Sequence, residues 1–165
     1  MLKLHTKNIP NNADENHPSI LAIKKYFINE VKKPRIYKNY IISHHSFDNP
    51  MTDEEKCFKK FAIGKNDNHQ TGNLDLSRCR RLHWIHMILD YMIKNNFVDP
   101  SGLIRLKTET NNILQDNFNI YILYEKYSYV IALNIRKNNM IVGTAFRAKD
   151  KPFERYNKMY SVRTI

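Results

Sequence analysis

The chain has 165 residues, of which 42% are hydrophobic and 12% aromatic, so it is long and apolar enough to bury one core. This composition excludes an intrinsically disordered chain, and 4 glycines are too few for a many-turned barrel or sandwich. Lysine and arginine number 27 against 16 acidic residues, a net charge of +11 that attracts phosphate backbones and anionic surfaces. A generic basic protein from a Lys- and Asn-rich proteome would carry the same charge.

The first part of the chain predicts a polar lead-in followed by a helix. Residues 1–18 are rich in polar side chains, and we assign residues 19–165 to a single α+β domain. Apolar side chains recur at helical spacing over residues 20–31, between a capping serine, Ser19, and the helix-stopping Pro34.

Two further helices are expected in the middle of the chain, after an extended segment at residues 35–46. Thr52 and Glu55 form a capping box, in which each side chain satisfies a free amide of the first helical turn. The next helix begins at Asp75 or Ser77 and continues to about residue 95, with a continuous apolar stripe.

The C-terminal part of the chain predicts strands. Tyr, Ile, Val and Leu dominate residues 118–127, 129–137 and 140–147, and Asn138-Asn139 is typical of a two-residue hairpin turn. Residues 103–116 fit either a strand or a short helical turn. The expected fold is therefore α+β, with N-terminal helices packed on one face of a C-terminal antiparallel sheet of three to four strands.

With the hairpin turn at Asn138-Asn139, one sheet face is apolar and the other is a shallow trough. Small side chains occupy the middle of this trough, and Arg136 and Arg147 stand at its ends. Glu125 and Arg147 then lie about 10 Å apart, close enough for both side chains to reach one phosphate. A one-residue slip of the register would reverse the two faces. An ordinary exposed ion pair explains Glu125 and Arg147 equally well.

Residues 77–86 contain the densest group of basic and titratable side chains. Arg78 and Arg81 fall in line with the apolar stripe of the expected helix, and His83 and His86 lie on the adjoining flank. Histidine exchanges a proton near neutral pH and arginine holds a phosphate with two parallel hydrogen bonds. Metal-free RNA cleavage needs both functions. For either histidine alone, a structural role is the commoner explanation.

Other residues predict no metal ion and no cofactor. Cys57 and Cys79 lack metal-ligand spacing and are expected to be free thiols, and His44, His45 and Asp48 also lack such spacing. No apolar stretch is long enough to cross a bilayer. We therefore expect a cytoplasmic protein, or one delivered into a target cell, with no membrane partner.

Three segments resemble the phage and polymorphic-toxin nucleases of the barnase–EndoU–colicin–RelE-like superfamily. These segments are LDLSRCRRLHWIHMILDY, YILYEKYSYVIALNIRK and MIVGTAFRAKD, within residues 74–150. The resemblance implies helices before a four-stranded antiparallel sheet and metal-independent endoribonuclease activity, often in toxins. By matched position it highlights Arg81, Thr144 and Arg147.

The sequence thus predicts a metal-independent endoribonuclease that acts as a toxin or phage-conflict effector. The candidate catalytic residues are Arg81, His83, His86, Glu125, Lys126, Thr144 and Arg147. The candidate nucleic-acid-binding residues are Arg78, Arg80, Arg136, Lys149 and Arg155. The expected partners are RNA and an acidic immunity or antitoxin protein. Two other classes fit the same features: a non-catalytic RNA- or DNA-binding module, and a basic effector that docks an acidic protein.

Overall fold

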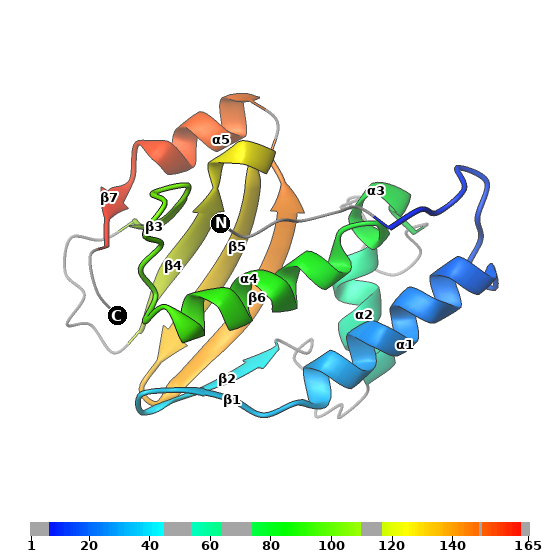
Figure 1. Ribbon diagram of the computed structural model, residues 1–165, viewed down its shortest axis with the longest axis horizontal. Helices are drawn as coiled ribbons and strands as arrows, with labels where there is room; N and C mark the ends of the chain where they lie inside the picture. Colours follow the sequence, from blue (N-terminus) through cyan, green and yellow to red (C-terminus); the bar gives the residue numbers. More distant parts are fainter. Residues whose placement is uncertain (1–6, 45–53, 64–73, 110–116, 149, 163–165) are drawn as a thin grey trace. The chain divides into compact units, whose positions relative to one another are not determined.

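The computed structural model describes residues 7–44, 54–63, 74–109, 117–148 and 150–162 (Figure 1). By its internal contacts the chain divides into two compact units. The helical unit comprises Leu2–Lys33 and Ser46–Ile88, and the sheet unit comprises Met1, Pro34–His45 and Leu89–Ile165.

The helical unit begins with helix α1, Pro18–Lys32, as the apolar spacing predicted. Its N-cap is His17 rather than Ser19, and the His17 Nδ1 atom accepts a hydrogen bond of 3.2 Å from the Ser19 amide. Pro18 suits the first helical position because that residue needs no amide donor. Helix α2, Glu54–Ala62, packs on α1 through the ring of Phe27, which lies 5.6 Å from Phe61. The capping threonine Thr52 lies outside the described residues.

The single helix predicted from residue 75 is in fact two helices, α3 (Leu76–Cys79) and α4 (Leu82–Lys94). The predicted start is confirmed, because the Asp75 carboxylate accepts hydrogen bonds of 2.9 and 3.1 Å from the amides of Ser77 and Arg78. The chain turns between the two helices. The apolar stripe hid this break because both helices bury residues of the same pattern.

The sheet unit has seven strands, so the prediction of a three- to four-stranded antiparallel sheet is wrong. The order is β1-β2-β6-β5-β4-β3-β7; β2 and β6 are parallel and the other neighbours antiparallel. The strands are β1 Arg35–Tyr37, β2 Tyr40–His44, β3 Ile104–Thr108, β4 Asn117–Tyr124, β5 Tyr129–Arg136, β6 Asn139–Arg147 and β7 Tyr160–Ser161. The missed strands are short, and a parallel partner far along the chain leaves no local pattern.

The three central strands are confirmed, but the register of the β5–β6 hairpin differs from the prediction. The turn is Lys137-Asn138, because Arg136 pairs with Asn139. Lys137 adopts a left-handed conformation with φ of 47°. The predicted Asn138-Asn139 turn is therefore wrong by one residue.

A bulge in β6 shifts the register again. Ala132 pairs with Thr144 and Leu133 with Val142, which leaves Gly143 as the extra residue. Beyond the bulge, Arg147 pairs with Tyr129 and so points to the face opposite that of Thr144. The predicted trough, which had Arg147 at one end, does not form, because Arg147 lies on the other face of the sheet.

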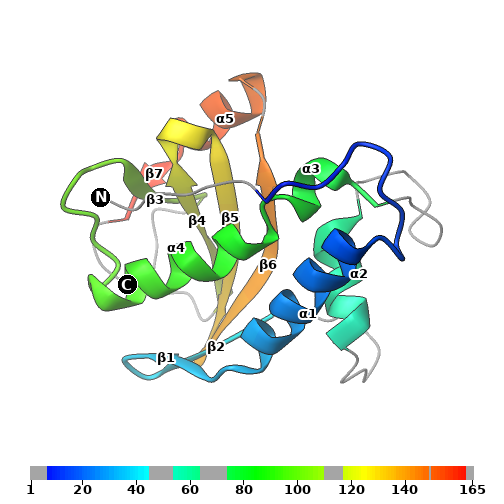
Figure 2. The same ribbon diagram turned by 45° about the vertical axis from the view of Figure 1, so that its right-hand side comes forward.

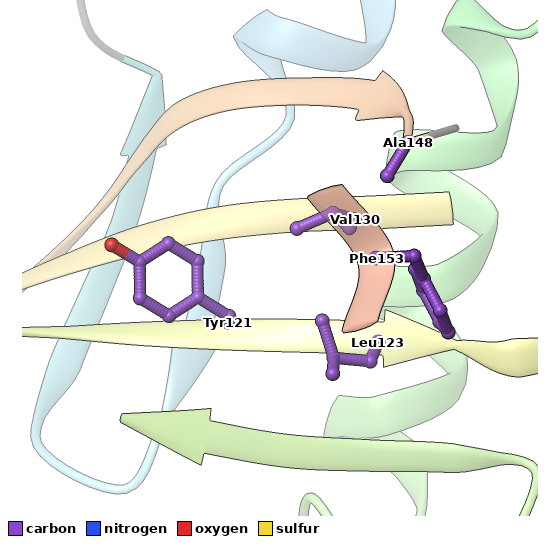
Figure 3. Packing of buried hydrophobic residues seen from close by; sticks show 5 residues of the cluster. All are labelled: Tyr121, Leu123, Val130, Ala148 and Phe153. Atoms are coloured by element: carbon purple, nitrogen blue, oxygen red, sulfur yellow. The ribbon is translucent and has the colours of Figure 1, made fainter. Parts of the chain in front are cut away.

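The sheet has one buried face and one half-open face. The buried face contains Ile122, Leu133 and Val142, all within 1% of complete burial. On the other face, helix α5 (Asp150–Asn157) covers one end of the strands (Figure 2). There Phe153 packs near Leu123 in a cluster completed by Tyr121, Val130 and Ala148 (Figure 3).

Candidate nucleic-acid interface

Two of the predicted RNA-binding arginines hold the helical unit together. Arg78 forms an ion pair of 3.4 Å with the capping residue Asp75. Arg80 donates hydrogen bonds to the carbonyl of Ile9, at 3.1 Å through Nε, and to Asn11 Oδ1 at 2.7 Å. Arg80 thus anchors the polar lead-in to the α3–α4 turn.

Arg81 also has local contacts within the helical unit. Its Nη1 donates a hydrogen bond of 2.5 Å to the carbonyl of Ser77, and its guanidinium carbon lies 5.6 Å from the Trp84 ring centroid. A guanidinium at that distance from an indole makes a cation–π contact. These contacts give Arg81 a structural role in joining α3 to α4.

His83 and His86 lie in an aromatic cluster of the helical unit. His83 is 6% exposed and His86 is fully buried. The His86 ring lies 5.2 Å from that of Phe27, and both histidines lie within 6.5 Å of Tyr26. A general acid or base has to reach the proton that it transfers. Burial therefore favours a packing role for these two side chains.

The predicted catalytic residues of the sheet unit do not gather at one point. Glu125 lies in a short 3₁₀ helix, Glu125–Tyr127, and its carboxylate forms an ion pair with Arg105. Lys126 is exposed, with its ammonium 5.5 Å from the Tyr127 ring. Arg147 is exposed on the face opposite that of Thr144. Arg81, His83 and His86 belong to the helical unit.

The half-open sheet face carries a second group of polar side chains, of which Tyr121 and Lys107 are buried beside α5 and β7 and the others are exposed or half-buried. Arg136 is exposed there, and Asn134 and Thr144 are half-buried. We call this group the open face; it consists of Lys107, Glu109, Asn119, Tyr121, Asn134, Arg136, Asn139 and Thr144. Of the remaining predicted RNA-binding residues, Arg155 is exposed on α5 and Lys149 lies outside the described residues.

Side-chain hydrogen bonds link three residues of the open face into a chain. Arg136 Nε donates to Asn134 Oδ1 at 2.6 Å, and Asn134 Nδ2 donates to Asn119 Oδ1 at 2.8 Å. Asn119 and Asn134 are direct cross-strand partners, and Arg136 lies two residues further along β5. We call these three residues the donor chain.

Tyr121 and Glu109 form a second polar contact on the open face. The Tyr121 hydroxyl donates a hydrogen bond of 3.1 Å to Glu109 Oε1, and its ring lies 4.9 Å from the ring of Tyr156. Burial, and then the hydrogen bond and negative charge of Glu109, raise the pKa of Tyr121 to about 12. The phenol therefore keeps its proton at neutral pH and remains a donor.

Lys107 lies beside Tyr121 on the neighbouring strand and is 7% exposed. Its ammonium donates to the Met159 carbonyl at 3.1 Å and to Ser161 Oγ at 3.0 Å, which ties β7 to β3. Burial, and secondarily the charge of Arg105, lower the pKa of Lys107. Lys107 is thus a buried hydrogen-bond donor that joins β7 to β3.

Sequence reasoning missed Asn119, Glu109 and Lys107 as site residues. Polar side chains at alternate positions of otherwise apolar strands were the available signal, at 119 and 121 in β4 and at 134 and 136 in β5. The signal was weak because a half-exposed sheet normally alternates in this way.

The two cysteines are free thiols in the core of the protein. Cys57 and Cys79 are buried, and burial raises the pKa of each to about 11. Among the residues that the structure describes, no three His, Cys, Asp or Glu side chains form a group suited to a metal ion. In the same part of the chain, every helix is too short or too polar to cross a bilayer.

Comparison with known protein-family models, curated proteins and solved structures finds no match to this chain.

Proposed function

We propose that the protein binds RNA through the open face of its sheet unit. The donor chain carries this proposal, because it places an exposed guanidinium and two oriented amides on one solvent-facing surface. Arginine and amide donors of this kind bind phosphate oxygens and base edges. The net charge of +11 draws a polyanion to such a surface.

The test is RNA binding at several salt concentrations. We expect affinity to fall steeply with salt, with a slope corresponding to roughly 4–7 phosphate contacts. Asn139→Glu places a negative charge on the open face and should weaken binding strongly. Asn12→Glu adds the same charge at an exposed position of the lead-in and serves as its control. Salt-independent binding, or equal effects of the two variants, contradicts the proposal.

Metal-independent RNA cleavage is the second candidate function, and the Tyr121–Glu109 contact favours it. In this reaction the 2′-hydroxyl loses its proton to the Glu109 carboxylate and its oxygen attacks phosphorus. The bond from phosphorus to the 5′-oxygen breaks, Tyr121 donates its proton to that leaving oxygen, and the protonated Glu109 returns a proton to Tyr121. Arg136 stabilises the charge of the phosphorane. These roles replace the two histidines with Glu109, which is exposed, and Tyr121, which is 9% exposed.

Cleavage is tested with total RNA in EDTA. Loss of a positioned acid or base costs about 10²–10⁴-fold in rate, so Glu109→Gln and Tyr121→Phe should both cut far more slowly. Lys94→Ala, at an exposed position of α4, is the control. If both open-face variants cleave at the parental rate and Arg81→Ala or Arg147→Ala loses activity, the active site lies at the residues predicted from the sequence. If the parent protein does not cleave RNA, this second function is wrong and only the proposed RNA binding stands.

An RNA-cleaving toxin also requires an inhibitor in the cell that makes it. An acidic immunity or antitoxin protein that covers the open face would match its charge. Competition between such a protein and RNA for the parent chain, lost in Arg136→Glu, would support this partner.

A further inference from the structure

The donor chain has a fixed direction, which determines what ligand it can take. Arg136 Nε can only donate, so Asn134 turns its oxygen toward Arg136 and its nitrogen toward Asn119. Asn119 must in turn present its oxygen to Asn134. Both amide oxygens already accept a hydrogen bond, so a ligand meets mainly N–H groups: the terminal nitrogens of Arg136 and the amide nitrogen of Asn119.

An N–H surface with one positive charge suits an anion. In the described part of the chain, no carboxylate lies within ion-pair distance of Arg136. By contrast, Arg35 and Arg105 of the same unit are each paired with an acidic side chain, Asp90 and Glu125. Arg136 is thus held in place by an amide and keeps its charge available for a phosphate.

Exposed apolar side chains continue the same row of the sheet. Arg136 pairs with Asn139, Asn139 with Ile41 and Ile41 with Ile36, so these four side chains lie on one face. Ile41 is 57% exposed and Ile36 is 64% exposed. By strand spacing Ile41 lies about 10 Å from Arg136. An anion site and an apolar surface therefore stand side by side.

We propose that this row selects single-stranded RNA, with the donor chain holding a phosphate and Ile41 and Ile36 supporting an unpaired base. A duplex keeps its bases stacked inside and offers mainly phosphates and groove edges. An unpaired nucleotide offers a phosphate and an apolar base face together. This inference rests on the proposed RNA binding and adds the class of RNA and the residues that distinguish it.

The experiment compares three ligands: a single-stranded 12-mer, the same strand in a duplex, and an abasic strand of the same length. The parent should bind the single strand about tenfold more tightly than the duplex, as expected when one base contributes. Arg136→Ala should weaken binding of all three ligands by about 10-fold or more, the usual loss for a charge-assisted hydrogen bond. It should also reduce the salt slope by about 0.7.

Ile41→Ser separates the base contact from the phosphate contact. It should weaken binding of the single strand about threefold to tenfold, as expected from lost apolar contact, and leave the abasic strand unchanged. Lys94→Ala is the control for loss of one charge from the same unit. Thermal melts confirm that each variant is folded, and added inorganic phosphate tests whether the site takes free phosphate as tightly as RNA.

Each outcome has a defined meaning. If the parent binds RNA but does not distinguish single strand from duplex, the selectivity inference is wrong and the proposed function stands. If the parent binds no RNA, both fail. If inorganic phosphate at equal phosphate concentration displaces the RNA, the site is one for free phosphate. If Ile41→Ser changes only the sedimenting mass of the protein, the isoleucines form a contact between copies of the chain.

Discussion

The segment at residues 77–86 and the open face of the sheet both contain arginine, but its contacts differ between the two regions. In the segment, Arg80 and Arg81 bond to backbone carbonyls, and His86 is fully buried. On the open face, Arg136 bonds to a neighbouring amide and stays exposed. A cluster of basic residues in the sequence can therefore stabilise the fold, while polar residues that are further apart in the sequence form the surface available to a ligand.

The physical reason lies in what surrounds each group. A helix break and an irregular lead-in both leave backbone carbonyls without helical donors, and arginine satisfies them with several N–H groups at once. On a sheet, side chains stand perpendicular to the backbone, whose own polar groups are paired between strands. Side chains of the open face thus bond to one another and keep donors for a partner.

The largest expected effect is on stability in the helical unit. His86→Ala removes a fully buried ring that packs against Phe27, and should lower the free energy of unfolding by about 2–4 kcal/mol. Urea unfolding followed by fluorescence of Trp84, the single tryptophan, reports on this unit. Arg136→Ala on the open face should change stability by less than about 0.5 kcal/mol. A His86→Ala protein of parental stability that has lost RNA cleavage would contradict the structural assignment.

The open face should show its own signature at alkaline pH. The pKa of Tyr121 is raised to about 12 in the folded protein, above the value near 10 of an unfolded chain. This contribution to stability is complete below pH 10 and is lost as pH rises through 12, an effect of about 2 kcal/mol. The difference in free energy of unfolding between the parent and Tyr121→Phe, measured with urea, should therefore become smaller between pH 10 and pH 12. An unchanged difference would mean that Glu109 and burial do not act on Tyr121.

Asp75→Ala tests the start of the arginine-rich segment. Asp75 caps α3 through the amides of Ser77 and Arg78, and loss of such a cap costs about 1 kcal/mol. Asp75→Asn keeps a side-chain oxygen that accepts hydrogen bonds from these amides. Its free energy of unfolding in urea should therefore be close to that of the parent. If the two variants are equally unstable, the ion pair with Arg78 is the more important contact.

The smallest effect is expected for Arg81→Ala. Removal of its contact with Trp84 should cost about 0.5 kcal/mol and shift the emission of that tryptophan. RNA affinity should fall less than about threefold, because this arginine contributes only screened charge. A loss as large as that of Arg136→Ala would place the helix segment in the RNA site.

Local patterns in the sequence were sufficient to predict α1 and the strands β4, β5 and β6. Helical spacing and runs of β-branched and aromatic residues act over a few neighbours, so they are visible without the fold. The alternation of side chains in β4 and β5 likewise placed Tyr121, Asn134 and Arg136 on one face of the sheet, whereas Thr144 was expected on the other face. The positive charge of the chain likewise follows from composition alone.

Register and burial were decided by the tertiary structure. The bulge at Gly143 moved Arg147 to the opposite face, since side chains alternate with every residue. The turn at Lys137 changed the cross-strand partners but not the faces. Strand β2 pairs in parallel with β6 across almost 100 residues of chain, which no local pattern records. The sequence identifies His86 as a side chain that can exchange protons. Its burial against Phe27, however, depends on packing between helices distant along the chain.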